Sequence, residues 1–149
     1  MKVPEFMFVI INPVMRMLLH SPLHRIFSDS IMLITWTGRK SGKQFTTPVR
    51  YLREGKTICC FTLKENVWWR NLRDGEIVTL RMNGRDAPYK AIAESDNTAR
   101  IRDGLERMFT AFPEDAVYQD VRLNKDRTPV AEDLVIAAEK AVMIESVPT

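Results

Sequence analysis

The amino-acid sequence predicts an α+β fold in which a small antiparallel β-barrel is surrounded by helices. Short runs rich in β-branched and aromatic residues alternate with turn-forming residues over much of the chain. The dipeptide Asn83-Gly84 separates two of these runs and is a strong signal for a β-hairpin. Apolar residues at helical spacing follow after residue 95. With 149 residues, 45% of them apolar, we expect a single domain, residues 1–149, around one core.

Six strands joined by antiparallel connections are expected in this barrel. They cover residues 31–36, 45–53, 57–62, 76–82, 85–94 and 141–147. Pro48 lies inside the second of these strands, where it cannot donate a hydrogen bond to a neighbouring strand. We therefore expect this stretch to be a sheet edge, a bulge or a place where a ligand approaches.

Helices are expected before the barrel and within it. In the N-terminal segment, residues 1–29, a helix starts at Asn12-Pro13 and is interrupted at Ser21-Pro22. Its apolar face either packs on the core, which we favour, or lies on a membrane surface. Within the barrel core, residues 30–94, a short helix is expected from Asn66 to Gly75.

The last segment, residues 95–149, should contain two helical stretches and the final strand. The first helix has an apolar face, a cap near Ser95 or Asp96, and an end at Pro113. Thr128-Pro129 opens the second helical stretch, which is rich in alanine.

The sequence favours a cytoplasmic protein without a membrane-spanning helix. The longest apolar stretch, residues 6–19, is too short and too interrupted to cross a bilayer, and no secretory signal is recognisable. The neighbouring Cys59 and Cys60 point to opposite faces of a strand, so they are expected to be small buried residues rather than a disulfide. No metal site is indicated, because the two histidines lie far from both cysteines.

The net charge of +3 is distributed unevenly. Residues 1–90 carry 15 Lys and Arg against 7 Asp and Glu, whereas residues 91–149 carry 7 against 12. The first part of the chain therefore has a charge of +8 and the second part −5. Such a bias concentrates anionic ligands near the basic part, although nucleic acid would exploit it equally well.

The segment between the first two expected strands concentrates cations, glycines and hydroxyl groups. It runs from Thr37 to Pro48 and reads Thr-Gly-Arg-Lys-Ser-Gly-Lys-Gln-Phe-Thr-Thr-Pro. Glycines can bring backbone N–H groups close to an anion, and the side chains supply charge and hydrogen bonds. The spacing differs from a Walker A loop, because three residues separate Gly38 from Gly42 and Gln44 replaces the metal-binding hydroxyl. The loop is therefore either an anion site or an ordinary solvated turn.

Three segments taken together resemble the deazaflavin (F420)-dependent nitroreductase and quinone reductase family. They are residues 33–43 (Leu-Ile-Thr-Trp-Thr-Gly-Arg-Lys-Ser-Gly-Lys), 46–49 (Thr-Thr-Pro-Val) and 68–73 (Trp-Trp-Arg-Asn-Leu-Arg). The resemblance implies a split β-barrel of the FMN-binding type with N-terminal, inter-strand and C-terminal helices. It also implies a cofactor, coenzyme F420, and a reductase that transfers hydride to a quinone, a nitroaromatic or an activated alkene.

The resemblance further implies which residues hold the cofactor. The anionic tail of F420 would lie on Arg39, Lys40, Ser41, Gly42 and Lys43, and the ring would lie along Thr46, Thr47, Pro48 and Val49. Thr62, Lys64 and the helix residues Trp68, Trp69, Arg70 and Asn71 would close the other side of the phosphate. On a helix, adjacent tryptophans point about 100° apart, so either one stacks on a ligand or both pack in the protein.

Other cofactors and functions stay open at this point. The connection of residues 62–66 is short and lacks the glycines that many relatives have, and a shorter anion site would also suit FMN. A different class of function is a non-catalytic module that holds an anionic lipid or nucleic acid on its basic face. Nucleic acid is not expected, because few aromatic residues are interleaved with the basic ones.

In a deazaflavin enzyme the cofactor performs the redox chemistry, so no catalytic triad is required. Tyr51 and Tyr118 are the candidate substrate contacts, because a phenol can donate a hydrogen bond or proton to an acceptor oxygen. Each of them could instead pack in the protein. The resemblance also implies a homodimer, and the N-terminal segment offers a peripheral membrane contact.

Overall fold

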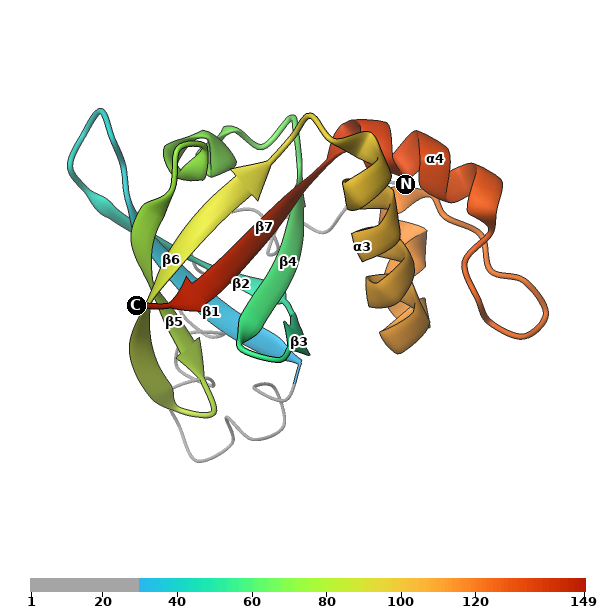
Figure 1. Ribbon diagram of the computed structural model, residues 1–149, viewed down its shortest axis with the longest axis horizontal. Helices are drawn as coiled ribbons and strands as arrows, with labels where there is room; N and C mark the ends of the chain where they lie inside the picture. Colours follow the sequence, from blue (N-terminus) through green and yellow to red (C-terminus); the bar gives the residue numbers. More distant parts are fainter. Residues whose placement is uncertain (1–29) are drawn as a thin grey trace.

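The computed structural model describes residues 30–149, in which one antiparallel sheet curls into a barrel and helices pack beside it (Figure 1). The strands are β1 Ile31–Thr37, β2 Gln44–Arg50, β3 Leu52–Glu54, β4 Thr57–Leu63, β5 Glu76–Met82, β6 Arg85–Glu94 and β7 Ala141–Pro148. The helices are α3 Thr98–Ala111 and α4 Ala131–Lys140, with the 3₁₀ helices η2 Val67–Leu72 and η3 Pro113–Gln119. The expected N-terminal helix and its membrane contact fall outside the described residues.

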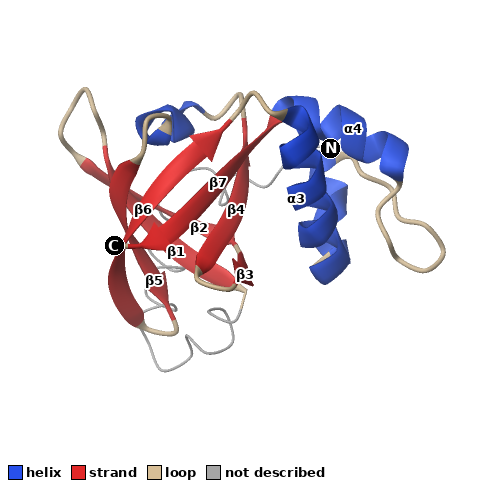
Figure 2. Cartoon of the chain, in the orientation of Figure 1, coloured by secondary structure: helices blue, strands red, loops and turns tan. Residues whose placement is uncertain are grey.

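The order of the strands explains why the sheet closes. Across the sheet the strands run β2-β1-β5-β6-β7-β4-β3, so β2 and β3 lie at opposite edges. In the chain, however, only Tyr51 separates the end of β2 from the start of β3. One residue spans less than about 4 Å, so the two edges must come together. The predicted α+β fold with an antiparallel barrel is confirmed, and Figure 2 shows the strands wrapping around one interior.

The described part of the chain forms seven strands rather than the six expected, because residues 45–53 form two strands. At Tyr51 the backbone N–H donates to the carbonyl of Ser30 at 2.9 Å, which ends the pairing of β2 with β1. Leu52 then pairs with Cys59 of β4. The chain thus changes partner strands at Tyr51. This change depends on tertiary pairing, and no local sequence pattern indicates it.

Pro48 lies in a strand at the edge of the sheet, which is one of the three settings predicted for it. It lies opposite Leu33 of β1, and within residues 30–149 β2 has no partner strand on its other side. A missing N–H group at this position therefore costs no interior ladder bond.

The start of α3 differs from the prediction, whereas its end agrees with it. The cap of α3 is Asn97, whose side chain accepts from the N–H of Arg100, rather than Ser95 or Asp96. The carboxylate of Glu94 accepts the N–H groups of Asp96 and Asn97, which places these residues in the preceding turn. Pro113 ends α3 as predicted and also begins η3. No helix in the described part of the chain is long and apolar enough to cross a membrane.

Two apolar clusters share the sheet as a common wall. The barrel interior contains alternate residues of the strands together with Trp68, Trp69 and Leu72 of η2. On the outside of β4 and β7, α3, η3 and α4 cover a second cluster. Cys60 belongs to the interior cluster and Cys59 to the outer one, so the predicted opposite placement of two buried thiols is confirmed.

Arg50 joins the edge of the barrel to the helical layer. Its Nε and Nη2 donate to the two carboxylate oxygens of Asp115 on η3, at 2.7 and 3.0 Å. Nη1 donates to the hydroxyl of Ser30 at 2.7 Å, and the guanidinium carbon lies 4.6 Å from the centre of the Phe112 ring. Asp115 is only 9% exposed, so this bidentate pair is largely removed from water.

Replacing Arg50 with Met should lower the free energy of unfolding by about 2–4 kcal/mol, because the largely buried carboxylate of Asp115 would lose its partner. Urea denaturation measures the change. Arg85→Met is the matched control, since Arg85 is exposed and has no ion pair among the described residues; a change within about 0.5 kcal/mol is expected there. Equal effects of the two substitutions would contradict the structural role of Arg50.

Both thiols should be unreactive in the folded protein. Burial raises the pKa of the Cys59 thiol to about 12, with a smaller contribution from Glu54, and burial also raises the pKa of the Cys60 thiol. An aromatic disulfide reagent at about pH 8 should label neither thiol until the protein is unfolded.

The same pKa shifts predict how stability depends on pH. Unfolded thiols ionise near pH 8.5, whereas the folded thiols stay neutral to higher pH. Their contribution to stability is complete below that value and is lost as the pH rises toward about 12. Rapid labelling of one thiol in the native state would contradict this account.

Candidate functional site

The loop between β1 and β2 is a closed turn held by its own backbone. The N–H of Gly38 donates to the carbonyl of Lys43, and the N–H of Gly42 donates to the carbonyl of Gly38, both at 2.8 Å. Gly42 has a φ of 71°, which favours glycine, and a Cβ on Gly38 would lie 2.9 Å from the Phe45 ring. The glycines therefore shape the turn. Their own N–H groups are bonded within the turn, so the side chains of the loop are the groups left to hold an anion.

The loop is fastened to η2, the short helix that contains the two tryptophans. The N–H of Arg39 donates to Oδ1 of Asn71 at 2.9 Å, and Nη1 of Arg39 donates to the carbonyl of Arg70 at 3.3 Å. Asn71 in turn donates from Nδ2 to the carbonyl of Trp68 at 2.8 Å. The structure thus brings together two segments that are more than thirty residues apart in the sequence and that were both predicted to hold the cofactor.

Five cations belong to the loop and to η2 with its C-terminal cap, which Arg39 joins, and we call them the loop–η2 cation cluster. Its members are Arg39, Lys40, Lys43, Arg70 and Arg73. All are exposed, and none has a carboxylate within 4.0 Å among the described residues.

Elsewhere on the described surface, many arginines have such a partner. Arg50, Arg81 and Arg107 each lie between 2.7 and 3.1 Å from a carboxylate oxygen. The cluster is therefore an uncompensated positive region, and its side chains rather than its backbone would bind an anion.

The tryptophans of η2 are both buried, so the structure favours packing over exposed stacking for both rings. Trp68 is 8% exposed and stacks on Trp36 at 4.6 Å between ring centroids. Trp36 also stacks on Phe45, next to the loop, at 5.8 Å. Trp69 is 4% exposed and donates from Nε1 to the carbonyl of Lys64 at 3.2 Å. These rings close the barrel beneath the cation cluster.

Residues 46–49 do not share one surface, because side chains alternate along a strand. Thr46 lies on the outer face, where its hydroxyl is 2.8 Å from that of Thr35. Thr47 faces the interior opposite Ile34, and Pro48 and Val49 are buried as well. Two buried polar atoms, Thr47 Oγ1 and Trp68 Nε1, lack a hydrogen-bond partner within the described part of the chain.

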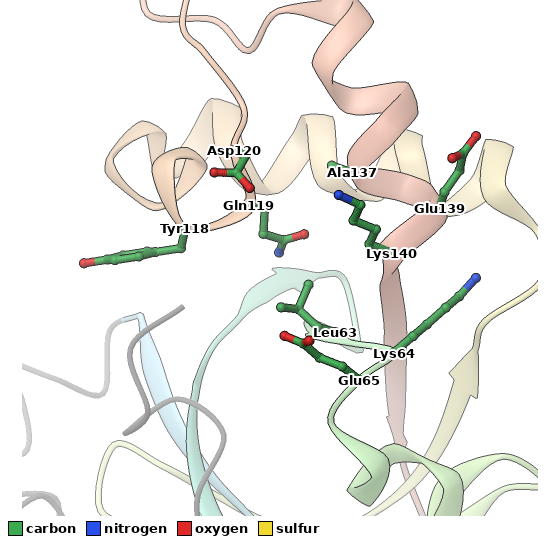
Figure 3. A pocket seen from close by; sticks show the side chains of 9 residues that line it. All are labelled: Leu63, Lys64, Glu65, Tyr118, Gln119, Asp120, Ala137, Glu139 and Lys140. Atoms are coloured by element: carbon green, nitrogen blue, oxygen red, sulfur yellow. The ribbon is translucent and has the colours of Figure 1, made fainter. Parts of the chain in front are cut away.

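The remaining predicted residues divide between a pocket and the core. Thr62 is buried and accepts a long hydrogen bond from Asn66 Nδ2 at 3.5 Å. Lys64 and Tyr118 line the same pocket, which has a volume of about 390 Å³ (Figure 3). Tyr51, at 5% exposure, belongs to the interior cluster and lies at the opposite end of β2 from the loop. Of the two tyrosines, only Tyr118 therefore lies beside a described pocket.

Sequence reasoning named only Lys64 and Tyr118 of the nine residues that line the pocket, and it left out one cation. Gln119 and Lys140 line the pocket, but each stands in an ordinary helical context that gives no functional signal. Arg73 completes the cation cluster, and it was visible in the sequence as the last cation of the tryptophan helix. Its guanidinium carbon lies 5.0 Å from the centre of the Trp69 ring, which Arg70 approaches to 5.8 Å.

Cofactor fit can be judged from these positions. The exposed, unpaired cations suit an acidic tail, and space around the Cα of Gly42 is open, with no atom within 4 Å of a Cβ built there. The unpartnered Thr47 hydroxyl and Trp68 indole N–H lie in the adjacent barrel end. The residues present therefore fit an anionic cofactor with a polar ring.

Residues 19–131 match the model of the family described as F420H(2)-dependent quinone reductase. No protein with a curated description matches the chain. A solved structure described as a domain-swapped dimer is 18% identical over 90% of this chain and 92% of its own, with a TM-score of 0.53.

Two further solved structures share the fold. The FAD- and haem-binding protein from Mycobacterium smegmatis is 11% identical over 87% of this chain and 67% of its own, with a TM-score of 0.50. A protein of unknown function from Agrobacterium tumefaciens is 12% identical over 80% of this chain, with a TM-score of 0.51. The chain spans 48% of the length of that protein. At these identities, the likenesses show the split-barrel fold alone.

Asn71→Ala should loosen the loop, because the substitution removes both the acceptor for the Arg39 N–H and the donor to the Trp68 carbonyl. We expect a loss of about 1–2 kcal/mol in local stability. Hydrogen exchange should become faster at Arg39 while the amides of β6 stay protected. Unchanged exchange at Arg39 would show that Asn71 does not hold the loop.

Proposed function

The chain belongs to the F420H2-dependent quinone reductase family, an oxidoreductase family, and we propose that it reduces a small electrophilic acceptor with reduced F420. A quinone is the first choice of acceptor, because the family is described by that activity. Nitroaromatics and activated alkenes are acceptors of the same electrophilic kind. When bound, F420H2 supplies a hydride from carbon C5 of its ring.

The observation that carries this proposal is the loop–η2 cation cluster. F420 has a phosphate and a glutamyl tail, so it presents several negative charges along one arm. Five exposed cations without carboxylate partners match such an arm better than the single phosphate of FMN. The contacts of Arg39 with Asn71 and Arg70 fix the relative positions of loop and helix, which reduces the ordering cost of binding.

The chain's own residues would bind and position the reactants. Arg39, Lys40 and Lys43 would hold the tail with Arg70 and Arg73, and the stacked rings beneath them would keep water out of the barrel end. Ser41 and Gly42 would shape the turn that carries these cations. The backbone of Thr46 to Val49, at the edge of the sheet, remains the proposed track for the ring.

Tyr118 is the better supported of the two proposed proton donors. Its side chain is partly exposed at the pocket, whereas Tyr51 is enclosed in the interior cluster. A phenol at the pocket can donate a hydrogen bond to an acceptor oxygen and so stabilise the negative charge that develops there.

A homodimer is proposed as the assembly. The support is the similar fold of the structure described as a domain-swapped dimer, which covers 90% of this chain. Native mass spectrometry of the purified protein gives the number of subunits directly, and a monomer at micromolar concentration would contradict this proposal.

Replacing Arg39, Lys40 and Lys43 together with Ala should weaken F420 binding by roughly 10- to 100-fold, since each exposed charge contact contributes about 0.5–1 kcal/mol. Titration monitored by the fluorescence of the cofactor ring measures the dissociation constant. Binding to the wild-type protein should also weaken with added salt.

The matched control replaces three exposed cations that lie elsewhere, Lys56, Arg85 and Lys125, with Ala. This variant has the same net charge as the test variant, so it separates local contacts from the overall field. The proposal fails if F420 does not bind the wild-type protein at micromolar concentration, or if both variants bind it equally well.

A further inference from the structure

The outer face of β5, β6 and β7 carries a group of exposed aliphatic side chains. Ile77 of β5 and Val147 of β7 lie directly opposite Lys90 of β6, on either side of it. Ile92 lies two residues further along β6 and therefore on the same face. Ile77, Ile92 and Val147 are 57%, 49% and 45% exposed. We call these three residues and Lys90 the β5–β7 patch.

The helical layer covers only the neighbouring part of this face. Met143, near the start of β7, is buried in the outer cluster against Gly104 of α3. Glu145 forms an ion pair with Arg100 in the first turn of α3, and Val147, two residues later, is exposed. Figure 1 shows α3 and α4 to one side of β5, β6 and β7. Within residues 30–149 the β5–β7 patch therefore has no covering helix.

The grouping of these side chains distinguishes the patch from an ordinary surface. Single exposed aliphatic residues are common on soluble proteins and need no explanation. Several of them side by side on three adjacent strands form a contiguous apolar area, which is typical of an interaction site. The patch is therefore a candidate contact surface.

The charges beside the patch indicate which partner it fits. Lys90 is exposed and has no carboxylate within 4.0 Å among the described residues. A Cβ on Gly75 would lie 3.1 Å from Cε of Lys90 and 3.4 Å from Cγ1 of Ile92, so these side chains lie next to the start of β5. Asp74 and Glu76, on either side of Gly75, are exposed and also lack an ion-pair partner in the described part of the chain. One cation and two carboxylates thus lie unpaired at the same end of the patch.

A second copy of this chain matches these features. A surface that carries both signs of charge can be complementary to itself, and in a two-fold contact each attraction occurs twice. Lys90 of one copy would meet Asp74 or Glu76 of the other, while the aliphatic side chains pack against one another. The two carboxylates would repel an anionic membrane or a nucleic acid.

We propose that two copies of this chain associate through the β5–β7 patch, with Lys90 of each copy paired to Asp74 or Glu76 of the other. The inference rests on the homodimer proposed above and adds to it a surface and the residues that hold it. It does not depend on which cofactor the protein binds.

Replacing Ile77 and Ile92 together with Thr tests the apolar part of the contact. Threonine keeps the β-branched shape that strands favour but offers less apolar area. The dissociation constant of the dimer, measured by analytical ultracentrifugation, should rise about 100-fold, because each lost group counts twice in a two-fold contact. Val135→Thr with Ile136→Thr is the matched control, since these side chains are similarly exposed but lie on α4, and it should leave the constant unchanged. Circular dichroism checks that both variants are folded.

Charge reversal tests the polar part of the contact. Lys90→Glu, and separately Asp74→Lys with Glu76→Lys, should each weaken the homodimer about tenfold, because like charges would then face each other. When the two variants are mixed, the introduced glutamate faces the introduced lysines, so a heterodimer should form in excess over both homodimers. Native mass spectrometry identifies it by its mass. Lys125→Glu changes the net charge as much as Lys90→Glu but lies outside the patch, and it should dimerise like the wild-type protein.

The outcomes separate the patch from the other proposals. A wild-type protein that is monomeric at micromolar concentration overturns the inference together with the proposed homodimer. If the variant lacking Ile77 and Ile92 dimerises as tightly as the wild-type protein, another surface joins the copies; the patch is then overturned and the homodimer stands. A mixture without excess heterodimer overturns the pairing of Lys90 with the carboxylates. The fluorescence titration with F420 tests the proposed reductase function separately, and its result decides none of these outcomes.

Discussion

The covalent connection between β2 and β3 is the constraint on which the rest of this structure depends. These two strands form the opposite edges of a seven-stranded sheet, yet only Tyr51 lies between them. The sheet must therefore curl until its edges meet, and the buried interior is a consequence of that closure. The bidentate contact of Arg50 with Asp115, immediately before Tyr51, fastens the closed edge to the helical layer.

Closure of the sheet leaves one end of the barrel that other residues must cover. The candidate site lies at this end. Residues of η2 supply the covering side chains, including Trp68 stacked on Trp36. The loop after β1 reaches the same end and is bonded to η2 through Arg39 and Asn71. In Figure 1 this loop and η2 lie on the side of the barrel away from α3 and α4. Cations from distant parts of the sequence thus lie near each other because the loop and η2 cover the same end of the barrel.

The sequence predicted the parts of the fold that local rules determine. The strands Glu76–Met82 and Arg85–Glu94 were placed correctly because Asn83-Gly84 fixes their hairpin, and Asn83 has the expected positive φ of 52°. The break at Tyr51 was missed because it follows from pairing with β4, not from local propensity. The cations of the loop were recognisable as a group, whereas the pocket around Gln119 depends on the packing of η3 and α4 against β4, which no local pattern encodes.

The central claim is that the loop–η2 cation cluster selects the acidic tail of F420. Native mass spectrometry after incubation with equal amounts of F420 and FMN tests it most directly, because the retained mass identifies the ligand. The account predicts that the wild-type protein retains F420 and that the variant lacking Arg39, Lys40 and Lys43 side chains does not. Retention of FMN in preference to F420, or of F420 equally by both proteins, would contradict it.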